Sequence, residues 1–152
     1  MRVSAKADYA VRAAIELAAA PPEQPVKAEH IAVAQGIPLA FLGNILGELR
    51  TAGIVQSRRG AEGGHWLARS ADDVTIAEVI RAVDGPLASV RGEAPNDLTY
   101  EGTAEPLRDV WVALRANVRA VLESVTLADV AANRLPEPVR SIAAHPEASA
   151  PR

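Results

Sequence analysis

The stretch KAEHIAVAQGIPLAFLGNILGELRTAGIVQSRRGAEGGHWLAR, residues 27–69, decides the fold of this chain. It predicts a short helix over about 29–34, a turn at Gly36, and a second helix from Pro38 to about Ala52. Proline suits the first position of a helix, and glycine suits both the turn and the helix end at Gly53. The stretch therefore predicts a helix-turn-helix.

The second of these helices has two different faces. Large apolar residues recur at i, i+3, i+4 and i+7, the spacing of a buried helical face. The opposite face carries small or polar residues, and in a helix-turn-helix that face enters the major groove of DNA. Only Asn44 on it can read adenine with a side-chain amide. The buried set is Leu42, Ile45, Leu46 and Leu49, and the outward set is Ala40, Gly43, Asn44, Gly47 and Thr51.

The two glycines on the outward face allow two interpretations. Each costs a helix interior about 1 kcal/mol relative to alanine. Either Gly43 and Gly47 permit a very close approach of the backbone to DNA, or they are tolerated surface glycines. The sequence leaves both open.

A hairpin with a glycine-rich tip follows the second helix. Residues 54–57 form its first arm, 60–64 its tip and 65–69 its return. Arg58 and Arg59 precede the tip, and arginine on a thin finger suits a narrow minor groove, where the negative potential is strongest. The alternative is a solvated arginine pair on an ordinary hairpin; the preceding helix-turn-helix favours DNA contact.

The composition of the chain limits the classes of function that it can have. At 152 residues and 49% hydrophobic content, the chain can form one core with a dimerisation element. No apolar run is long enough to span a membrane and no signal peptide opens the chain, so we expect a cytoplasmic protein. The absence of cysteine excludes disulfides and cysteine-ligated clusters. Catalytic motifs are absent and the three histidines are scattered, so we expect neither an enzyme nor a metal site.

The net charge of −3 is unevenly distributed. Residues 1–70 hold eight Lys and Arg against six Asp and Glu, a balance of +2. Residues 71–152 hold eight against thirteen, a balance of −5. The positive half contains the helix-turn-helix, as an electrostatic footprint for DNA requires. Because +2 is modest, we expect few phosphate contacts per subunit and a need for dimerisation.

Further helices flank the hairpin unit. Ser4 predicts the N-cap of a helix over about 5–20, and Thr75 opens a helix to about 84. The segment 87–103 has no sustained period and predicts a loop. Pro106 starts the longest helix, to about Val125, and Thr126 caps a short last helix to about 132.

The longest helix carries six apolar residues spaced by 4, 3, 4, 3 and 4, which is a heptad seam. We expect this seam to form a homodimer interface, which also suits a palindromic operator; packing inside one subunit is the alternative. The seam residues are Leu107, Trp111, Leu114, Val118, Val121 and Val125.

Several motifs in order resemble the Rrf2 family of bacterial regulators, which includes IscR, NsrR and CymR. They are MRVSAKADYAVRAAIELA at 1–18, AQGIP at 34–38, L-x-x-L-R-x-x-G-I-V at 46–55 and RRGAEGG at 58–64. The resemblance covers about residues 1–130 and implies a homodimeric winged-helix transcription factor. It implies DNA contacts by Arg2, Ser4, Lys6, Tyr9, Ala40, Phe41, Gly43, Asn44 and Arg59, and we add Arg58.

The chain also departs from well-known members of that family. Their recognition helices place larger polar groups where Ala40 and Gly43 stand, so no operator sequence can be carried over. Cluster-binding members hold three cysteines in the loop, whereas the corresponding residues here are Gly92, Leu98 and Ala104. The resemblance therefore implies a member that lacks the cluster cysteines, and we expect no cofactor.

Together these patterns predict a mainly α fold with a small β-hairpin wing. We expect a winged helix-turn-helix domain at 1–84, a loop at 85–103, a dimerisation helix and short terminal helix at 104–132, and a disordered tail at 133–152. The predicted function is a sequence-specific DNA-binding regulator, in this family more often a repressor. The alternative is a protein-interaction module of winged-helix fold that responds to a partner protein or a small-molecule effector.

Overall fold

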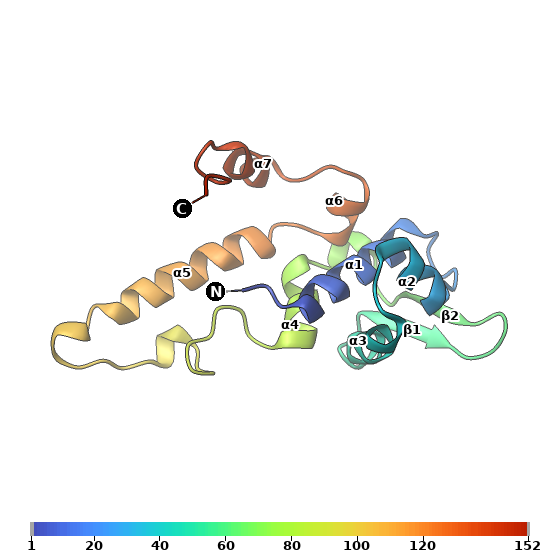
Figure 1. Ribbon diagram of the computed structural model, residues 1–152, viewed down its shortest axis with the longest axis horizontal. Coiled ribbons are helices and arrows are strands. Elements are labelled where there is room, and N and C mark those ends of the chain that lie inside the picture. Colours follow the sequence, from blue (N-terminus) through green and yellow to red (C-terminus); the bar gives the residue numbers. More distant parts are fainter. Residues whose placement is uncertain (1, 152) are drawn as a thin grey trace.

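The computed structural model describes residues 2–151 and is mainly helical, with one two-stranded hairpin (Figure 1). This confirms the predicted fold class. A compact unit contains the N-terminal helices and the hairpin, and α5 with the loop before it extends from that unit as an arm. The elements are α1 (Ala5–Ala19), α2 (Ala28–Gln35), α3 (Leu39–Thr51), β1 (Val55–Arg58), β2 (Gly64–Leu67), η1 (Ala71–Asp73), α4 (Ile76–Asp84), η2 (Pro95–Asp97), η3 (Gly102–Ala104), α5 (Leu107–Leu122), α6 (Leu127–Ala131) and α7 (Glu137–Ala144).

The core of the N-terminal unit forms around α1, which packs against α3, α4 and α6. The buried face of α1 is built from small side chains, and this lets three neighbouring helices approach closely. Larger residues from α2, α3 and the hairpin complete the core. The buried alanines of α1 are Ala7, Ala10, Ala13 and Ala14, all fully buried.

Side-chain caps fix the starts of three helices, as the sequence predicts. The Ser4 hydroxyl accepts a 2.9 Å hydrogen bond from the Ala7 amide at the start of α1. Thr75 accepts one from Glu78 at the start of α4. Thr126 and Asp129 exchange hydrogen bonds in a reciprocal capping box at α6.

Helix α5 begins after Pro106 as predicted but ends at Leu122, so the expected extension to Val125 is wrong. The chain turns after α5 because Thr126 pairs with Thr75 in an isolated β-bridge. Val125 is 6% exposed, and its carbonyl accepts a 2.9 Å hydrogen bond from the Ile76 amide. Val125 therefore packs inside its own protomer and is not available to the seam.

The tail contains a helix that the sequence analysis missed. Within 133–152, expected to be disordered, residues Glu137–Ala144 form α7. Pro136 and Pro138 lie at its N-cap and first turn, where proline is tolerated because the first amides of a helix have no intrahelical partner. Those prolines mark the start of a helix and do not prevent one. Arg152 lies outside the described residues.

Taken singly, none of the helices within residues 2–151 is both long and apolar enough to cross a membrane.

Candidate nucleic-acid interface

Helices α2 and α3 form the predicted helix-turn-helix. The chain direction changes by 117° between them, within the range of about 90–120° that is typical of this motif. Gly36 ends α2 in the left-handed conformation at φ 61°, where a side chain would be strained. Ile37 follows it and is 4% exposed, so its side chain anchors the turn in the core.

The two faces of α3 lie as predicted. All four residues of the inner face are at most 2% exposed. On the outer face Ala40, Gly43 and Asn44 are exposed, and so is Phe41 at 61%. The sequence analysis missed two residues of this surface, Leu39 at 48% exposure and Arg50. Arg50 stands seven positions after Gly43, and this spacing could have identified it.

Neither glycine of the outer face is required by packing within the protomer. A Cβ atom added at Gly43 or at Gly47 would meet nothing within 4 Å. A shallow depression of ≈490 Å³ lies along this side of α3, between Asn44 and Ala82 of α4. The backbone of α3 is therefore open to a close-fitting partner here.

The β1–β2 hairpin, the wing, is fastened to the segment before α2. Val26 and His65 exchange two backbone hydrogen bonds of 2.8 Å, and Lys27 Nζ donates one of 2.8 Å to the Gly60 carbonyl at the tip. This contact depends on Gly64, at φ 151°, because an added Cβ would lie 2.7 Å from the Val26 oxygen. The wing is thus held at two points in the half nearer its tip.

The two wing arginines differ in their contacts. Arg58 Nη2 donates a 3.3 Å hydrogen bond to the Glu62 carbonyl inside the tip. Arg59 is exposed and makes no hydrogen bond or ion pair with any residue between 2 and 151. Its cation is therefore the one at the tip that is free to bind a partner.

Two of the predicted contacts near the start of α1, Ser4 and Lys6, are engaged with other elements. The Ser4 hydroxyl donates to Asp84 Oδ2 at 2.5 Å, and Lys6 Nζ pairs with Glu48 Oε1 of α3 at 2.8 Å. The guanidinium of Arg12 lies 5.0 Å above the ring of Tyr9. Arg2 is exposed and lines a groove beside α5. A DNA role for Arg2, Ser4, Lys6 and Tyr9 stays a prediction.

His65 lies one residue pair below the tip of the wing, with one imidazole nitrogen unsatisfied. Burial, and then the positive charge of Arg50, lower the pKa of His65 below its usual 6.5, while Glu29 acts in the opposite direction. Its Nδ1 atom is buried and accepts no hydrogen bond from the described residues. Protonation of His65 therefore opposes the folded wing.

We expect the stability of the protein to fall as the pH drops below the unfolded-state pKa of His65. Because the pKa of His65 is lower in the folded state than in the unfolded state, the contribution of this residue to stability is complete above about pH 6.5. That contribution is lost as the pH falls through the folded-state pKa. Thermal midpoints measured between about pH 8 and pH 5 should fall less steeply for His65→Gln than for the wild type. His30→Gln is the matched control, because it makes the same replacement at an exposed residue of α2. Identical slopes for wild type and His65→Gln would contradict this assignment.

Side chains of α5 hold the loop that precedes it. Trp111 Nε1 donates to the Tyr100 hydroxyl at 3.1 Å, and Arg108 Nη2 donates to the Asn96 carbonyl at 2.9 Å. Pro95 and Leu98 are buried. The loop is therefore packed against α5.

Similarity to known proteins identifies the family of this chain. Residues 3–133 match the family described as Rrf2, iron-dependent transcriptional regulator. The chain belongs to the Rrf2 family. Rv1287 of Mycobacterium tuberculosis, named as an HTH-type transcriptional regulator, is 54% identical over 143 residues, covering 94% of this chain and 89% of that protein.

Solved structures of Rrf2 relatives share the fold. The structure of CymR, the global cysteine regulator of Bacillus subtilis, superposes with a TM-score of 0.74 at 32% identity, covering 88% of this chain and 98% of that one. IscR of T. potens gives a TM-score of 0.71 at 33% identity, with 88% of each chain covered. The chain is thus a transcriptional regulator with a DNA-binding winged-helix fold.

The iron named in the Rrf2 description does not fit the residues present. A thiolate-held cluster needs cysteine, and the sequence has none. At a loop position where the family resemblance implies a cluster cysteine, Leu98 is 1% exposed and offers no ligand atom. Between residues 2 and 151 no group of three or more His, Asp or Glu is placed to hold a metal.

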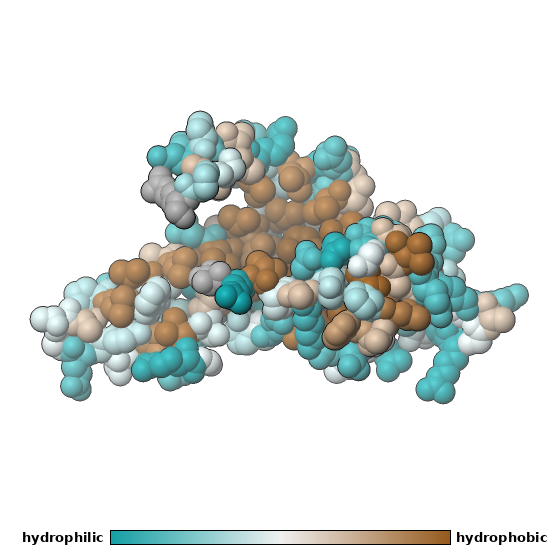
Figure 2. Space-filling view, in the orientation of Figure 1, coloured by the Kyte–Doolittle hydropathy of each residue, from teal (hydrophilic) through white to brown (hydrophobic). Residues whose placement is uncertain are grey.

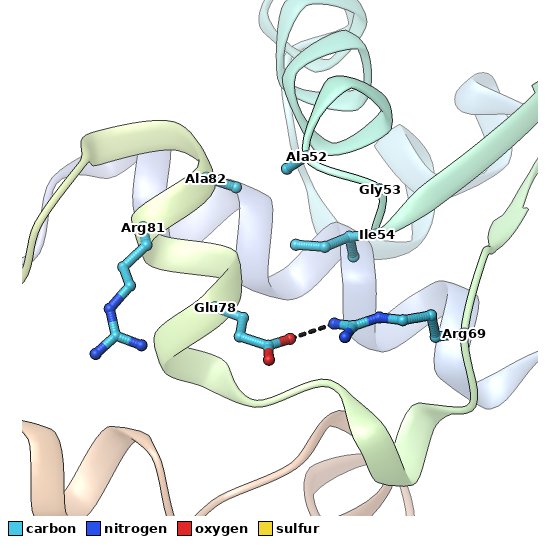
Figure 3. A pocket seen from close by; sticks show the side chains of 7 residues that line it. All are labelled: Ala52, Gly53, Ile54, Arg69, Glu78, Arg81 and Ala82. Atoms are coloured by element: carbon cyan, nitrogen blue, oxygen red, sulfur yellow. Dashed lines mark hydrogen bonds and ion pairs between the residues drawn. The ribbon is translucent and has the colours of Figure 1, made fainter.

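Behind α3 a depression of ≈470 Å³ separates the end of that helix and the start of β1 from α4 (Figure 3). Glu78 and Arg69 form an ion pair across it, while Arg81 points away and bonds Glu123 after α5. Hydrogen bonds from Arg81 and Arg119 lower the pKa of Glu123. These pairs join the wing to α4, and α4 to the end of α5.

Proposed function

We propose that this protein is a homodimeric repressor that binds a pseudo-palindromic operator in the cytoplasm without an iron–sulfur cluster. In this proposal α3 enters the major groove and the wing enters the neighbouring minor groove. The observation that carries it is the pairing of an open, small-residue face on α3 with a fastened wing whose Arg59 is free.

In the major groove, the first half of α3 would lie closest to the base edges. Ala40 and Gly43 keep that half slim, so that the backbone can approach. Asn44 would then read adenine through a bidentate amide contact. The exposed apolar groups of Leu39 and Phe41 suit the methyl group of thymine.

In the minor groove, Arg59 would supply the charge. A narrow minor groove concentrates negative potential, and a single arginine on a thin hairpin can follow it without touching base edges. The contacts of Val26 and Lys27 with the wing hold that arginine in a fixed place relative to α3. Two subunits would double this otherwise modest charge.

Dimerisation would use the seam of α5. No residue of α5 is buried in the protomer, although its apolar residues share one face. Two copies related by a twofold axis would place their α3 helices about one DNA turn apart, as a palindromic operator requires. We retain Leu107, Trp111, Leu114, Val118 and Val121 in the proposed interface and omit the buried Val125.

One observation favours a second candidate, a protein-interaction module. Leu39 and Phe41 expose two large apolar side chains on the reading face, and such residues are enriched at protein interfaces. In that case the winged helix would dock a partner protein and would not read DNA sequence. Sequence-selective binding to DNA separates the two candidates, because only the first one predicts it.

Gly43→Ala should make the protein more stable and the operator complex weaker. Alanine favours the helix by up to about 1 kcal/mol, and its methyl group has free space in the protomer. In the complex the same methyl would hold the backbone away from the bases and weaken binding by about tenfold. Thermal unfolding and fluorescence anisotropy on a selected operator measure the two effects.

Gly47→Ala is the matched control, because Gly47 lies about one turn further from the N-terminal half of α3. We expect a similar gain in stability and a smaller loss of affinity. If Gly43→Ala gains stability and leaves operator affinity unchanged, the glycine is a tolerated surface residue and close approach is wrong.

A further inference from the structure

Helix α7 carries apolar side chains that the described chain covers only in part. Val139 and Ile142 are three residues apart and share one face of α7, which forms its apolar stripe, while Leu135 lies just before the helix and, like Val139, is half-buried. Ile142 is 59% exposed. No other element between residues 2 and 151 packs extensively against α7. The helix also lies beyond residue 133, where the Rrf2 match ends.

A helix of this length needs a packing partner. α7 has eight residues, and isolated helices shorter than about 12–15 residues are marginal in water. Its start is fixed by prolines, with no side-chain cap to compensate. The helical form of α7 therefore calls for a surface that covers its apolar stripe.

Helix α5 also exposes large apolar side chains. Figure 1 shows α7 standing clear of α5, with open space between them. Figure 2 shows hydrophobic residues gathered along α5 and beneath the α7 lobe, with a notch separating that lobe from α5. On α5, Val110 is 55% exposed and Leu114 is 37% exposed. A third apolar helix lying against α5 would cover such side chains.

We propose that this third helix is α5 of a second copy of the chain, so that α7 closes over the dimer interface as a strap. The inference rests on the proposed homodimer and names an element of it. Twofold symmetry would use the strap twice, because each copy supplies one α5 and one α7.

The length of α5 supports this choice of occupant. Its 16 residues make little more than two heptads, whereas a coiled-coil pattern is sustained over about three to four. Two crossed α5 helices therefore need additional apolar contact to form a stable pair. The stripe on α7 supplies such contact, and it does so without involving the DNA-binding surface.

Ile142→Glu tests the strap. We expect sedimentation equilibrium to give a dimer dissociation constant about tenfold or more above that of the wild type, because an apolar contact is lost twice per dimer. Ser141→Glu is the matched control, since it adds the same charge to an exposed residue on the other side of α7. It should dimerise like the wild type.

The outcomes separate the strap from the dimer itself. If the wild-type chain is monomeric at every concentration, the proposed homodimer fails and the strap with it. If the wild type is dimeric and Ile142→Glu dissociates no more than Ser141→Glu, the strap alone is overturned. A selective loss in Ile142→Glu supports both.

Discussion

Leu114→Glu should convert the dimer into folded monomers that no longer bind the operator at physiological protein concentrations. Leu114 lies in the middle of the α5 seam and is 37% exposed, so a charge there is tolerated in the protomer. In the interface the same charge would be buried against its twin across the twofold axis, where it has no partner. A dimer that binds two linked half-sites has about 10²–10⁴-fold higher affinity than a monomer that binds one. The operator affinity of the monomeric variant should therefore fall by that factor.

Light scattering measures the mass and anisotropy measures the affinity. Ala116→Glu is the matched control, because Ala116 is exposed on the opposite side of α5 and receives the same charge. Circular dichroism should show both variants folded. A Leu114→Glu protein that remains dimeric would refute the seam.

Arg59→Ala should weaken specific binding by about 1–3 kcal/mol, the scale of one good groove contact. The side chain makes no contact within the described chain, so its removal should leave the thermal midpoint unchanged. The loss should appear in complexes with the operator, where the wing meets a narrow minor groove. Anisotropy titrations of wild type and variant give the difference directly.

Arg134→Ala removes the same charge from an exposed position remote in sequence from the wing and serves as the control. Arg58→Ala should also weaken binding, with a loss of stability at the tip because its bond to Glu62 disappears. Unchanged affinity in Arg59→Ala would remove the wing from the mechanism.

The elements that the sequence predicts well are those with local signals. The helix-turn-helix depends on Gly36 and on an apolar spacing within α3, and the caps at Ser4 and Thr126 need only residues three positions away. Such signals do not depend on the rest of the fold, and the structure confirms them. The antiparallel pairing of β1 with β2 is similarly local.

What the sequence could not predict depends on contacts between distant residues. The end of α5 is set by the pairing of Thr126 with Thr75, which no helical pattern reveals. The bond between Ser4 and Asp84 joins residues 80 positions apart. For α7, prolines that read as breakers lie at the helix start, and its apolar stripe is too short to predict a helix without a partner.

Within the candidate site, the sequence predicted which residues lie at the surface that would bind DNA. It did not predict which of their side chains are free of contacts within the protein. The sequence could not distinguish Arg58 from Arg59, because only the folded tip shows that one of them bonds the Glu62 carbonyl. It likewise could not show that Gly43 and Gly47 lack any internal packing role. Both distinctions come from the three-dimensional surroundings of the side chains.

The central claim is that this chain reads a DNA sequence unaided. The most direct test is a fluorescence-anisotropy titration against the DNA upstream of its own gene, with a scrambled duplex as control, at low and near-physiological salt. The titration is repeated with a chelator, because the residues present do not fit an iron–sulfur cluster. We expect a preference for the upstream duplex that survives the higher salt and is unaffected by the chelator. Equal binding to both duplexes, or binding that vanishes with salt, would contradict it.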